Sequence, residues 1–375
     1  MPATAAAPFR ADHVGSLLRP ASVAEARKAH IEEKSLDAAG LKAAEDAAIP
    51  GLIRMQEDAG LPVVTDGEAR RSWWHYDFMS MLDGLELVER GEGVQFAGTQ
   101  LRPIFPTITG PLDFPDDHPM LDHYRFVAAN TKVMPKISIP GPSCVDFRIG
   151  TDDLGVAEYQ EDRQAFFAAI AATYKKAVQA FYDAGCRYLQ LDDIFFAYLC
   201  DPKHRADKVA EGRDLDALIG HYAWMMHEAI KDRPADMVIG MHMCRGNYKS
   251  TYAATGGYDM AADAVFNQTG VDVFFMEYDT ERAGGLEPLR LLSKGKQRVM
   301  AGFITTKVGE MESLDSLKRK FDEAAKHTDL GQLGIAPQCG FASTEEGNAI
   351  SVDDQKRKLE LVVKTAEEIW GGVAA

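Results

Sequence analysis

Four side chains that suit a metal ion each follow a short apolar run of this chain. His242 and Cys244 follow the first run, Glu277 the second and Cys339 the third. Two sulfurs, one imidazole and one carboxylate form a donor set that suits tetrahedral Zn²⁺. A lone His-x-Cys on an apolar run is more often a packed core pair than a metal site. Because all three runs end in ligand residues, the sequence predicts a zinc site where three strand ends converge.

Zinc in such a site would activate a thiol. A free thiol, with a pKa near ~8.5, is mostly protonated at neutral pH, whereas a zinc-bound thiol is deprotonated outright. Two protein thiolates and a carboxylate would make the zinc electron-rich, so that any thiolate bound to it would stay nucleophilic. Four protein ligands normally close a structural site. Catalysis therefore requires one ligand to leave, with Glu277 as the candidate, or a fifth coordination position. A purely structural zinc is the alternative.

The elements that must position these ligands alternate between short apolar runs and longer helical patterns. The predicted strands lie near 10–14, 61–66, 135–140, 188–192, 237–242, 272–277, 297–303 and 332–336. One helix face is formed by Phe166, Ile170, Tyr174, Val178 and Phe181, and similar patterns cover about 206–232, 312–328 and 352–370. Eight strands with intervening helices predict an α/β fold of the (β/α)8 TIM barrel type. A doubly wound parallel sheet is the main alternative.

Most of the predicted strands end in polar groups. In barrels of this type the active site is built at the C-terminal ends of the strands. Any single one of these groups could be a helix cap, a turn or a surface ion pair, but their coincidence at one rim favours a site. The groups are Gly15-Ser16, Asp66-Gly67-Glu68, Pro140-Gly141-Pro142-Ser143, Asp192-Asp193, His242 with Cys244, Glu277, Lys307 and Cys339.

One stretch, about 91–113, departs from this alternation. Its glycines and prolines, with apolar residues near period two, predict a β-hairpin excursion out of the loop after the second strand. No internal repeat or Pro/Ser-rich linker marks a domain boundary. We therefore expect residues 1–375 to form a single barrel domain.

The amino-acid composition limits the kinds of molecule that this protein can bind. The 41 basic and 57 acidic residues give a net charge of −16, which argues against a nucleic acid or an anionic membrane surface as partner. Residues 1–7 lack the features of a signal peptide, and no apolar run approaches the ~20 residues of a membrane span. The five scattered cysteines indicate reduced thiols or metal ligands. We expect a cytoplasmic protein that acts on small molecules, and the sequence leaves open whether it forms a homo-oligomer.

These motifs, taken together, resemble a known family. Over nearly its whole length the chain is similar to the catalytic C-terminal domain of cobalamin-independent methionine synthase, in a short single-domain form. The matching segments are Val14-Gly15-Ser16, Asp66-Gly67-Glu68, Leu189-Gln190-Leu191-Asp192-Asp193, His242-Met243-Cys244, Glu277 and Gln338-Cys339-Gly340. The resemblance implies a zinc cofactor held by His242, Cys244, Glu277 and Cys339. It also implies that Ser16, Glu68 and Asp192 hold the amino-acid part of a homocysteine-like acceptor.

The chain departs from that family where the methyl donor would bind. Lys307 stands where the family has a histidine after the seventh strand, and the segment from Pro140 stands where a tryptophan packs on the pterin. The family's pterin-binding glutamate falls near Tyr198, and only Arg102-Pro103 is similar to its folate-side segment. Methylfolate, methylcobalamin and a small methylated compound all remain candidate donors.

The residues after the second strand offer two interpretations. Trp73, Trp74, His75 and Tyr76, with Arg70-Arg71, would form either a different donor pocket or a helix face packed on the hairpin. His13, just before Gly15-Ser16, is either a substrate-binding residue or a core histidine.

We therefore predict a zinc-dependent methyltransferase that acts on a thiol, with homocysteine as the favoured acceptor. Asp192 and Lys307 are the catalytic candidates, and His13 joins the expected substrate-binding set. One alternative is alkyl transfer to another thiol, as in epoxyalkane:coenzyme M transferases or corrinoid-dependent methyltransferases. The other is a non-catalytic barrel with structural zinc.

Overall fold

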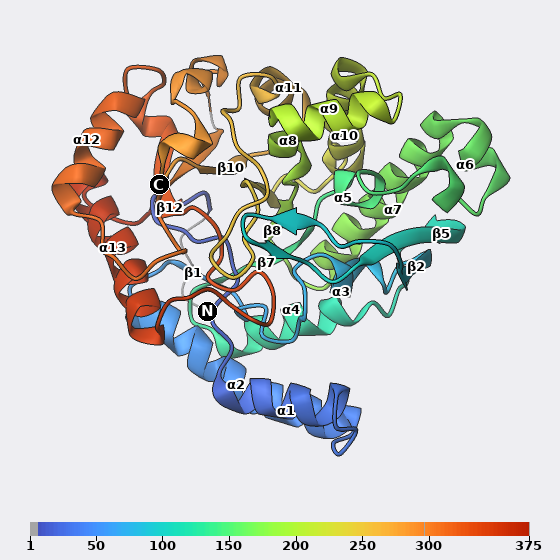
Figure 1. Cartoon of the computed structure of the whole chain (residues 1–375). Helices are drawn as coiled ribbons and strands as arrows, with labels where there is room; N and C mark the ends of the chain where they lie inside the picture. The colour runs from blue at the N-terminus through green and yellow to red at the C-terminus, as the bar shows by residue number, and fades with distance from the viewer. Residues whose placement is uncertain (1–6, 296, 375) are drawn as a thin grey trace.

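A parallel sheet forms the centre of the computed structural model, which describes residues 7–295 and 297–374 (Figure 1). Six strands follow one another in chain order across it, each hydrogen-bonded in parallel to the next. They are β7 (Ile137–Pro140), β8 (Tyr188–Asp192), β9 (Val238–Met243), β10 (Val273–Glu277), β11 (Arg298–Ile304) and β12 (Leu333–Pro337). Nearly every residue of these strands is buried, as expected for a sheet covered on both faces.

Two further segments close this sheet into a barrel. β1 (Val63–Val64) pairs in parallel with β6 (Met134–Pro135), which leads directly into β7. At the other edge, Ala11 forms a parallel bridge with Ile335 of β12. The Thr65 hydroxyl donates a hydrogen bond of 2.6 Å to the carbonyl of Gly15, which joins the two segments. Eight strand positions thus form the predicted (β/α)8 barrel rather than a doubly wound sheet.

Helices surround these strands, and α1 and α2 extend along the lower side in Figure 1. The longer ones are α1 (Ala21–Ile31), α2 (Ala38–Asp58), α4 (Pro119–Asn130), α7 (Arg163–Asp183), α9 (Pro202–Ala210), α10 (Leu215–Ile230), α12 (Leu314–Ala324) and α13 (Val352–Trp370). The short ones are α3 (Tyr76–Met79), α5 (Ser143–Asp146), α6 (Ala157–Glu161), α8 (Phe195–Tyr198) and α11 (Ala262–Gln268). No helix within 7–295 or 297–374 is long and apolar enough to cross a membrane.

The helix predicted over 206–232 is two helices. Gly212, in the left-handed region at φ 77°, follows α9. The Asp214 carboxylate then accepts hydrogen bonds from the backbone N–H groups of Asp216 and Ala217 and begins α10. The helix expected over 312–328 is shorter at both ends, because Ser313 caps α12 and the helix ends at Ala324.

The excursion after the second strand is a hairpin within a hairpin. Its outer strands, β2 (Asp83–Glu89) and β5 (Ile104–Asp113), pair antiparallel, so it begins before the predicted start at residue 91. Its inner strands, β3 (Gln95–Phe96) and β4 (Thr99–Gln100), form the tip. The N–H of Ala97 donates a hydrogen bond of 2.9 Å to the carbonyl of Tyr252, which fixes the tip to the loop after β9.

A buried polar network inside the barrel leads up to the strand ends. The Lys136 ammonium lies 2.7 Å from the Asp12 carboxylate and donates a hydrogen bond of 3.0 Å to the Gln190 side chain. The Tyr188 hydroxyl donates to the other Asp12 oxygen at 2.7 Å. Gln190 in turn donates a hydrogen bond of 2.7 Å to Asp192. Satisfied networks of this kind are rigid, so Asp192 is held in a defined orientation.

Candidate metal centre and substrate pocket

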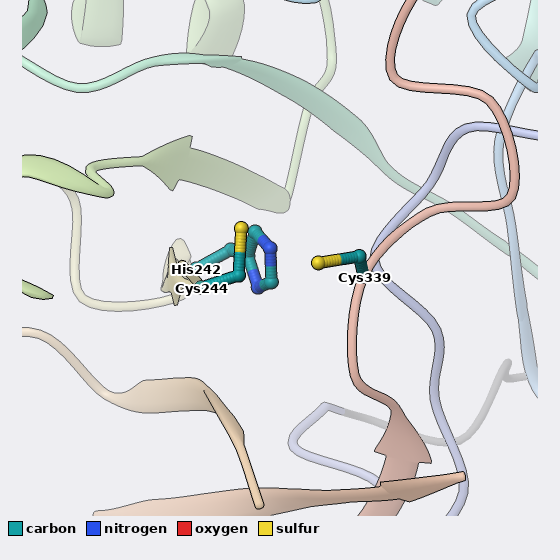
Figure 2. Close-up of side chains that lie close together, drawn as sticks. All are labelled: His242, Cys244 and Cys339. Atoms are coloured by element: carbon teal, nitrogen blue, oxygen red, sulfur yellow. The ribbon is translucent and has the colours of Figure 1, made fainter. Parts of the chain in front are cut away.

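Three of the four predicted metal ligands lie together at the mouth of the barrel. His242 belongs to β9, Cys244 follows that strand directly, and Cys339 follows β12 (Figure 2). One ligand atom from each lies within 4.8 Å of the others. Ligand atoms around tetrahedral zinc are about 3.4–3.8 Å apart, given metal–ligand distances near 2.0–2.3 Å. A small contraction would therefore close the cluster around zinc.

The electrostatics of this cluster also fit a cation. Burial, followed by the neighbouring Cys244, raises the pKa of the Cys339 thiol well above its ordinary value. Burial opposes a charged His242, but Cys339, Asp192 and Glu277 outweigh it and raise the His242 pKa. The Nδ1 atom of His242 is buried and has no hydrogen-bond partner among the described residues. Buried thiols become thiolates beside a strong cation, so this donor set fits zinc.

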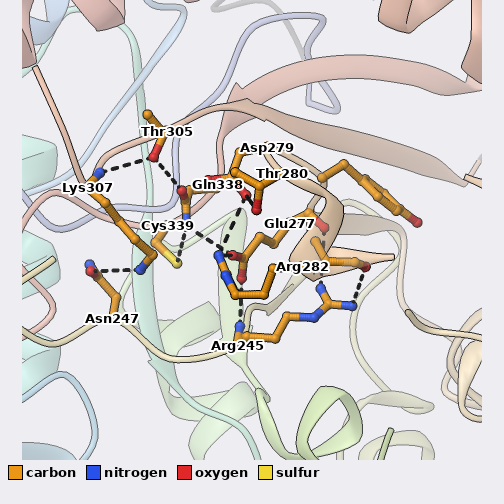
Figure 3. A network of polar contacts seen from close by, with 12 residues as sticks. Arg245, Asn247, Glu277, Asp279, Thr280, Arg282, Thr305, Lys307, Gln338 and Cys339 are labelled. Atoms are coloured by element: carbon orange, nitrogen blue, oxygen red, sulfur yellow. Dashed lines mark hydrogen bonds and ion pairs between the residues drawn. The ribbon is translucent and has the colours of Figure 1, made fainter. Parts of the chain in front are cut away.

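The fourth predicted ligand, Glu277, lies outside the cluster. Its carboxylate forms an ion pair with Arg282 and accepts hydrogen bonds from the Arg245 N–H at 2.7 Å and the Gln338 amide at 3.2 Å (Figure 3). Burial would raise its pKa, but Lys307, Arg282 and Arg245 together lower it. Glu277 is therefore an anion held by the protein's own donors.

Three of the predicted substrate-binding residues line one pocket with the cluster. Ser16, Glu68 and Asp192 share this pocket with His242 and Cys244. Carboxylates at the ends of the second and fourth barrel strands thus lie beside the sulfur and imidazole ligands at the end of the fifth. The structure brings acidic groups and candidate metal ligands into the same enclosed space.

The backbone places Glu68 in the pocket at a conformational cost. Glu68 has a φ of 55° and Gly67 a φ of 68°, so two consecutive residues adopt the left-handed conformation that side chains disfavour. The Ser138 hydroxyl donates a hydrogen bond of 2.9 Å to one carboxylate oxygen. The other oxygen is buried without a partner among the described residues, and burial is the main cause that raises the Glu68 pKa. The free oxygen can accept a hydrogen bond from a ligand.

Asp192 is positioned by a hydrogen bond and Ser16 by close packing. Asp192 ends β8 and is fixed by Gln190, and burial raises its pKa to about 7. Ser16 lies against the loop after β12, where a Cβ atom on Gly340 would stand 1.8 Å from its hydroxyl. Only glycine at position 340 lets Ser16 approach the segment that carries Cys339.

Two predicted site residues lie elsewhere. His13 is buried, its Nε2 atom has no hydrogen-bond partner among the described residues, and it does not line the pocket. Strand alternation accounts for this, because its neighbour Asp12 faces the barrel interior. Lys307 also lies outside the pocket lining. Its ammonium donates to Gly246, Asn247 and Thr251 and holds the loop after β9 in place.

The residues after the second strand form a pocket wall and also contact the hairpin. Trp73, Trp74 and His75 line the pocket, whereas the Tyr76 hydroxyl donates a hydrogen bond of 2.7 Å to Ile104 of β5. Several lining residues were not expected from the sequence: Phe96, Arg148, Phe195 and Tyr248. Phe195 and Tyr198 stand three residues apart on α8, a helical spacing that could have indicated a shared face.

Comparison with known proteins now decides the family. Residues 9–368 match the family model described as the catalytic domain of cobalamin-independent synthase. The chain belongs to this family. The protein YxjH of Bacillus subtilis (strain 168), whose function is uncharacterized, is 44% identical over 367 residues, which is 97% of this chain and 95% of YxjH.

Solved structures of cobalamin-independent synthases have the same fold. One from Listeria monocytogenes, named as a candidate vitamin-B12-independent methionine synthase, has 37% sequence identity and a TM-score of 0.77, and the match covers 98% of this chain and 99% of that one. A B12-independent methionine synthase from Shewanella sp. W3-18-1 has 19% identity and a TM-score of 0.69, with 97% and 98% covered, which supports the fold. The family resemblance seen in the sequence is confirmed.

Proposed function

We propose that this member of the cobalamin-independent synthase family transfers a methyl group to the sulfur of homocysteine and so forms methionine. One observation supports this most strongly: His242 and Cys244 share a pocket with Glu68 and Asp192. The first pair belongs to a cluster suited to zinc, and the second is suited to the ammonium group of an amino acid.

The carboxylates favour an amino-acid thiol over other thiols. Glu68 has a buried oxygen without a partner among the described residues, and burial raises the pKa of both Glu68 and Asp192. An ammonium group between them would stabilise their charged forms. A sulfonate thiol such as coenzyme M would instead meet two acidic groups, and a structural zinc site would need neither of them.

Zinc held by His242, Cys244 and Cys339 would deprotonate the acceptor thiol and keep its sulfur nucleophilic. The chain's own part is to orient the reactants. Glu68, Asp192 and Ser16 hold the amino-acid end, and Arg282 forms an ion pair with the Glu277 carboxylate. The acceptor thiol releases its proton to water, the thiolate sulfur forms a bond to the methyl carbon, and the demethylated donor leaves with the electron pair of the broken bond.

The donor pocket differs from that of a methylfolate-dependent enzyme. Lys307, at the position of the family's histidine, is fully engaged with the loop after β9. The segment from Pro140 to Ser143 offers no aromatic ring for a pterin. Stacking on a ring at this one position, worth about 1–3 kcal/mol, is therefore absent, and the aromatic rings of the pocket come from other elements. We therefore propose that polyglutamylated methylfolate is a poor donor, and that methylcobalamin or a small methylated compound serves instead.

The test is methionine formation by the zinc-loaded protein. Homocysteine would be offered with methyltetrahydrofolate, methylcobalamin and small methylated compounds in separate reactions, and coenzyme M would replace homocysteine in parallel. Methionine from at least one donor, without methylation of coenzyme M, supports the proposal. Alkylation of coenzyme M alone would favour the alternative thiol transferase. No product on either thiol from a protein that retains zinc would favour a structural metal.

A further inference from the structure

The pocket lining contains side chains of different character. Glu68 and Asp192 are acidic. Many of the other lining side chains are aromatic and come from the loop after β1, the hairpin tip, α8 and the loop after β9. These aromatic residues are Trp73, Trp74, Phe96, Phe195, Tyr198 and Tyr248. Among the described lining residues, Arg148 is the one arginine, and no lysine joins it.

Arg148 differs from the arginines around it. Within 7–295 and 297–374, its guanidinium has no ion pair and no hydrogen bond, and its Nε atom is buried without a partner. The neighbouring Arg213 lies 2.9 Å from the Asp146 carboxylate, and Arg163 forms an ion pair with the same residue. Arg71 donates a hydrogen bond of 2.6 Å to the Ser138 carbonyl. The protein thus supplies partners for these arginines but none for Arg148.

On the side of the substrate pocket, Arg148 faces an aromatic ring and a neutral imidazole. Its guanidinium lies 5.7 Å from the centre of the Phe195 ring. Burial, and then the charge of Arg148, hold the pKa of His75 well below its ordinary value, so His75 is neutral. A cation among uncharged rings attracts anions more strongly than one in water. The pocket is therefore negative where the acceptor is proposed to bind and positive at Arg148.

We propose that Arg148 binds an anionic group of the methyl donor, a carboxylate, sulfonate or phosphate, while the donor's apolar body packs on the aromatic wall. The assignment of this ligand as the methyl donor rests on the proposed function. The planar guanidinium can form two parallel hydrogen bonds to such a group, which an ammonium cannot match. Arg148 also lines an adjoining cavity, whose lining includes both basic residues (Lys208, Arg213) and acidic ones (Asp207, Glu211), so a longer donor has space to extend beyond it.

Binding can be tested without turnover. Isothermal titration of the zinc-loaded protein would compare three probes with the same apolar body: 2-naphthoate, 2-naphthyl phosphate and the neutral 2-naphthamide. We expect at least one anion to bind about ten- to a hundredfold more tightly than the amide, as for a hydrogen bond to a charged group. Arg148→Met should remove this preference and leave amide binding intact, whereas Arg148→Lys should keep part of it.

A matched control is Arg205→Met, because Arg205 donates to the Leu199 carbonyl and does not line the pocket. It should bind all three probes as the unmodified protein does. Equal binding of anions and amide to the unmodified protein, or an unchanged preference in Arg148→Met and Arg148→Lys, would overturn the proposal. If the protein prefers the anionic probes but forms no methionine, the proposed function is refuted and the anion site is still supported.

Kinetics then separate donor from acceptor. With any donor that supports turnover, Arg148→Met should raise the KM for the donor and leave the KM for homocysteine unchanged. A change confined to the homocysteine KM would place Arg148 in the acceptor site and would overturn its assignment to the donor.

Discussion

The Glu277 carboxylate is bound by the Arg282 guanidinium and lies outside the cluster of His242, Cys244 and Cys339. Arg282 belongs to the 3-10 helix η2 (Glu281–Ala283) and lies 4.5 Å from the centre of the Tyr252 ring. Catalytic zinc sites keep three protein ligands and one open position, whereas structural sites are closed by four. The ion pair of Glu277 with Arg282 therefore favours a catalytic centre.

Replacement of Arg282 by glutamine should free Glu277 to compete with the acceptor sulfur. We expect the rate with homocysteine to fall on the order of 10- to 100-fold, the range typical of changes to groups that surround a metal site. Zinc should be retained at least as well as in the unmodified protein, as measured by competition with a chelator. The double variant Glu277→Gln with Arg282→Gln should recover part of the rate.

Arg290→Gln is the control for this experiment. Arg290 is exposed, and its guanidinium donates to a backbone carbonyl within its own short helix. Faster zinc loss from Arg282→Gln, with no recovery in the double variant, would show that Glu277 does not compete for the metal.

Cysteine replacements should separate metal ligands from core thiols. Cys339→Ser should lose zinc at a chelator concentration that leaves the unmodified protein with about one zinc per chain. Cys186→Ser should keep its zinc, because Cys186 is buried away from the cluster and its thiol donates to the Tyr188 carbonyl. Metal analysis of the two purified variants checks this, and equal zinc contents would count against Cys339 as a ligand.

Asp192→Asn should weaken the use of homocysteine and leave the zinc content unchanged. Removing one partner of a buried charge pair costs about 2–5 kcal/mol in binding, which would appear in kcat/KM for the acceptor. Asp193→Asn is the matched control, since Asp193 is as deeply buried, bonds to Ser143 and does not line the pocket. Similar kinetics for the two variants would remove the argument for an amino-acid acceptor.

His13 should affect stability rather than catalysis. Burial is the main cause that lowers its pKa from 6.5 to about 3. Between these pH values the unfolded chain binds a proton that the folded chain does not, so the free energy of unfolding falls as the pH falls. Above pH 6.5 the unfolded chain no longer binds this proton, so the contribution of His13 to the free energy of unfolding stops changing with pH. His13→Asn should flatten this decline by up to about 1.4 kcal/mol per pH unit.

Denaturant unfolding of both proteins at pH values from 7 down to 4 would measure this difference. The KM for homocysteine should stay unchanged in His13→Asn. Parallel stability curves, or a raised KM, would mean that His13 acts in a way its buried position does not explain.

The barrel and the three-residue cluster were accessible from the sequence because they follow from strand periodicity. Apolar runs located six of the strands closely, and ligands placed directly after a strand meet at one rim of a parallel barrel. The first strand was predicted least accurately, since only Ala11 of the range 10–14 forms a bridge. The break between α9 and α10 was also readable, because Gly212 and Asp214 are ordinary helix stop and start residues.

Other features depend on how loops pack, which residue spacing does not determine. Nothing in the sequence indicated that Arg282 would turn back onto Glu277 or that Lys307 would bind the loop after β9. Arg148 lies in the segment after β7. Its spacing from the other site residues matches neither a helical nor a strand period. His13 was misplaced for a different reason: it is one residue out of phase with Asp12, which faces inward.

X-ray absorption at the zinc edge, recorded with and without homocysteine, would show whether the acceptor sulfur binds the metal. We predict that zinc in the protein alone has the sulfurs of Cys244 and Cys339 and the His242 nitrogen as ligands, with Zn–S distances near ~2.3 Å. Homocysteine should add one further sulfur at the same distance. An unchanged sulfur count at saturating homocysteine would contradict the proposal that this cluster activates the acceptor thiol.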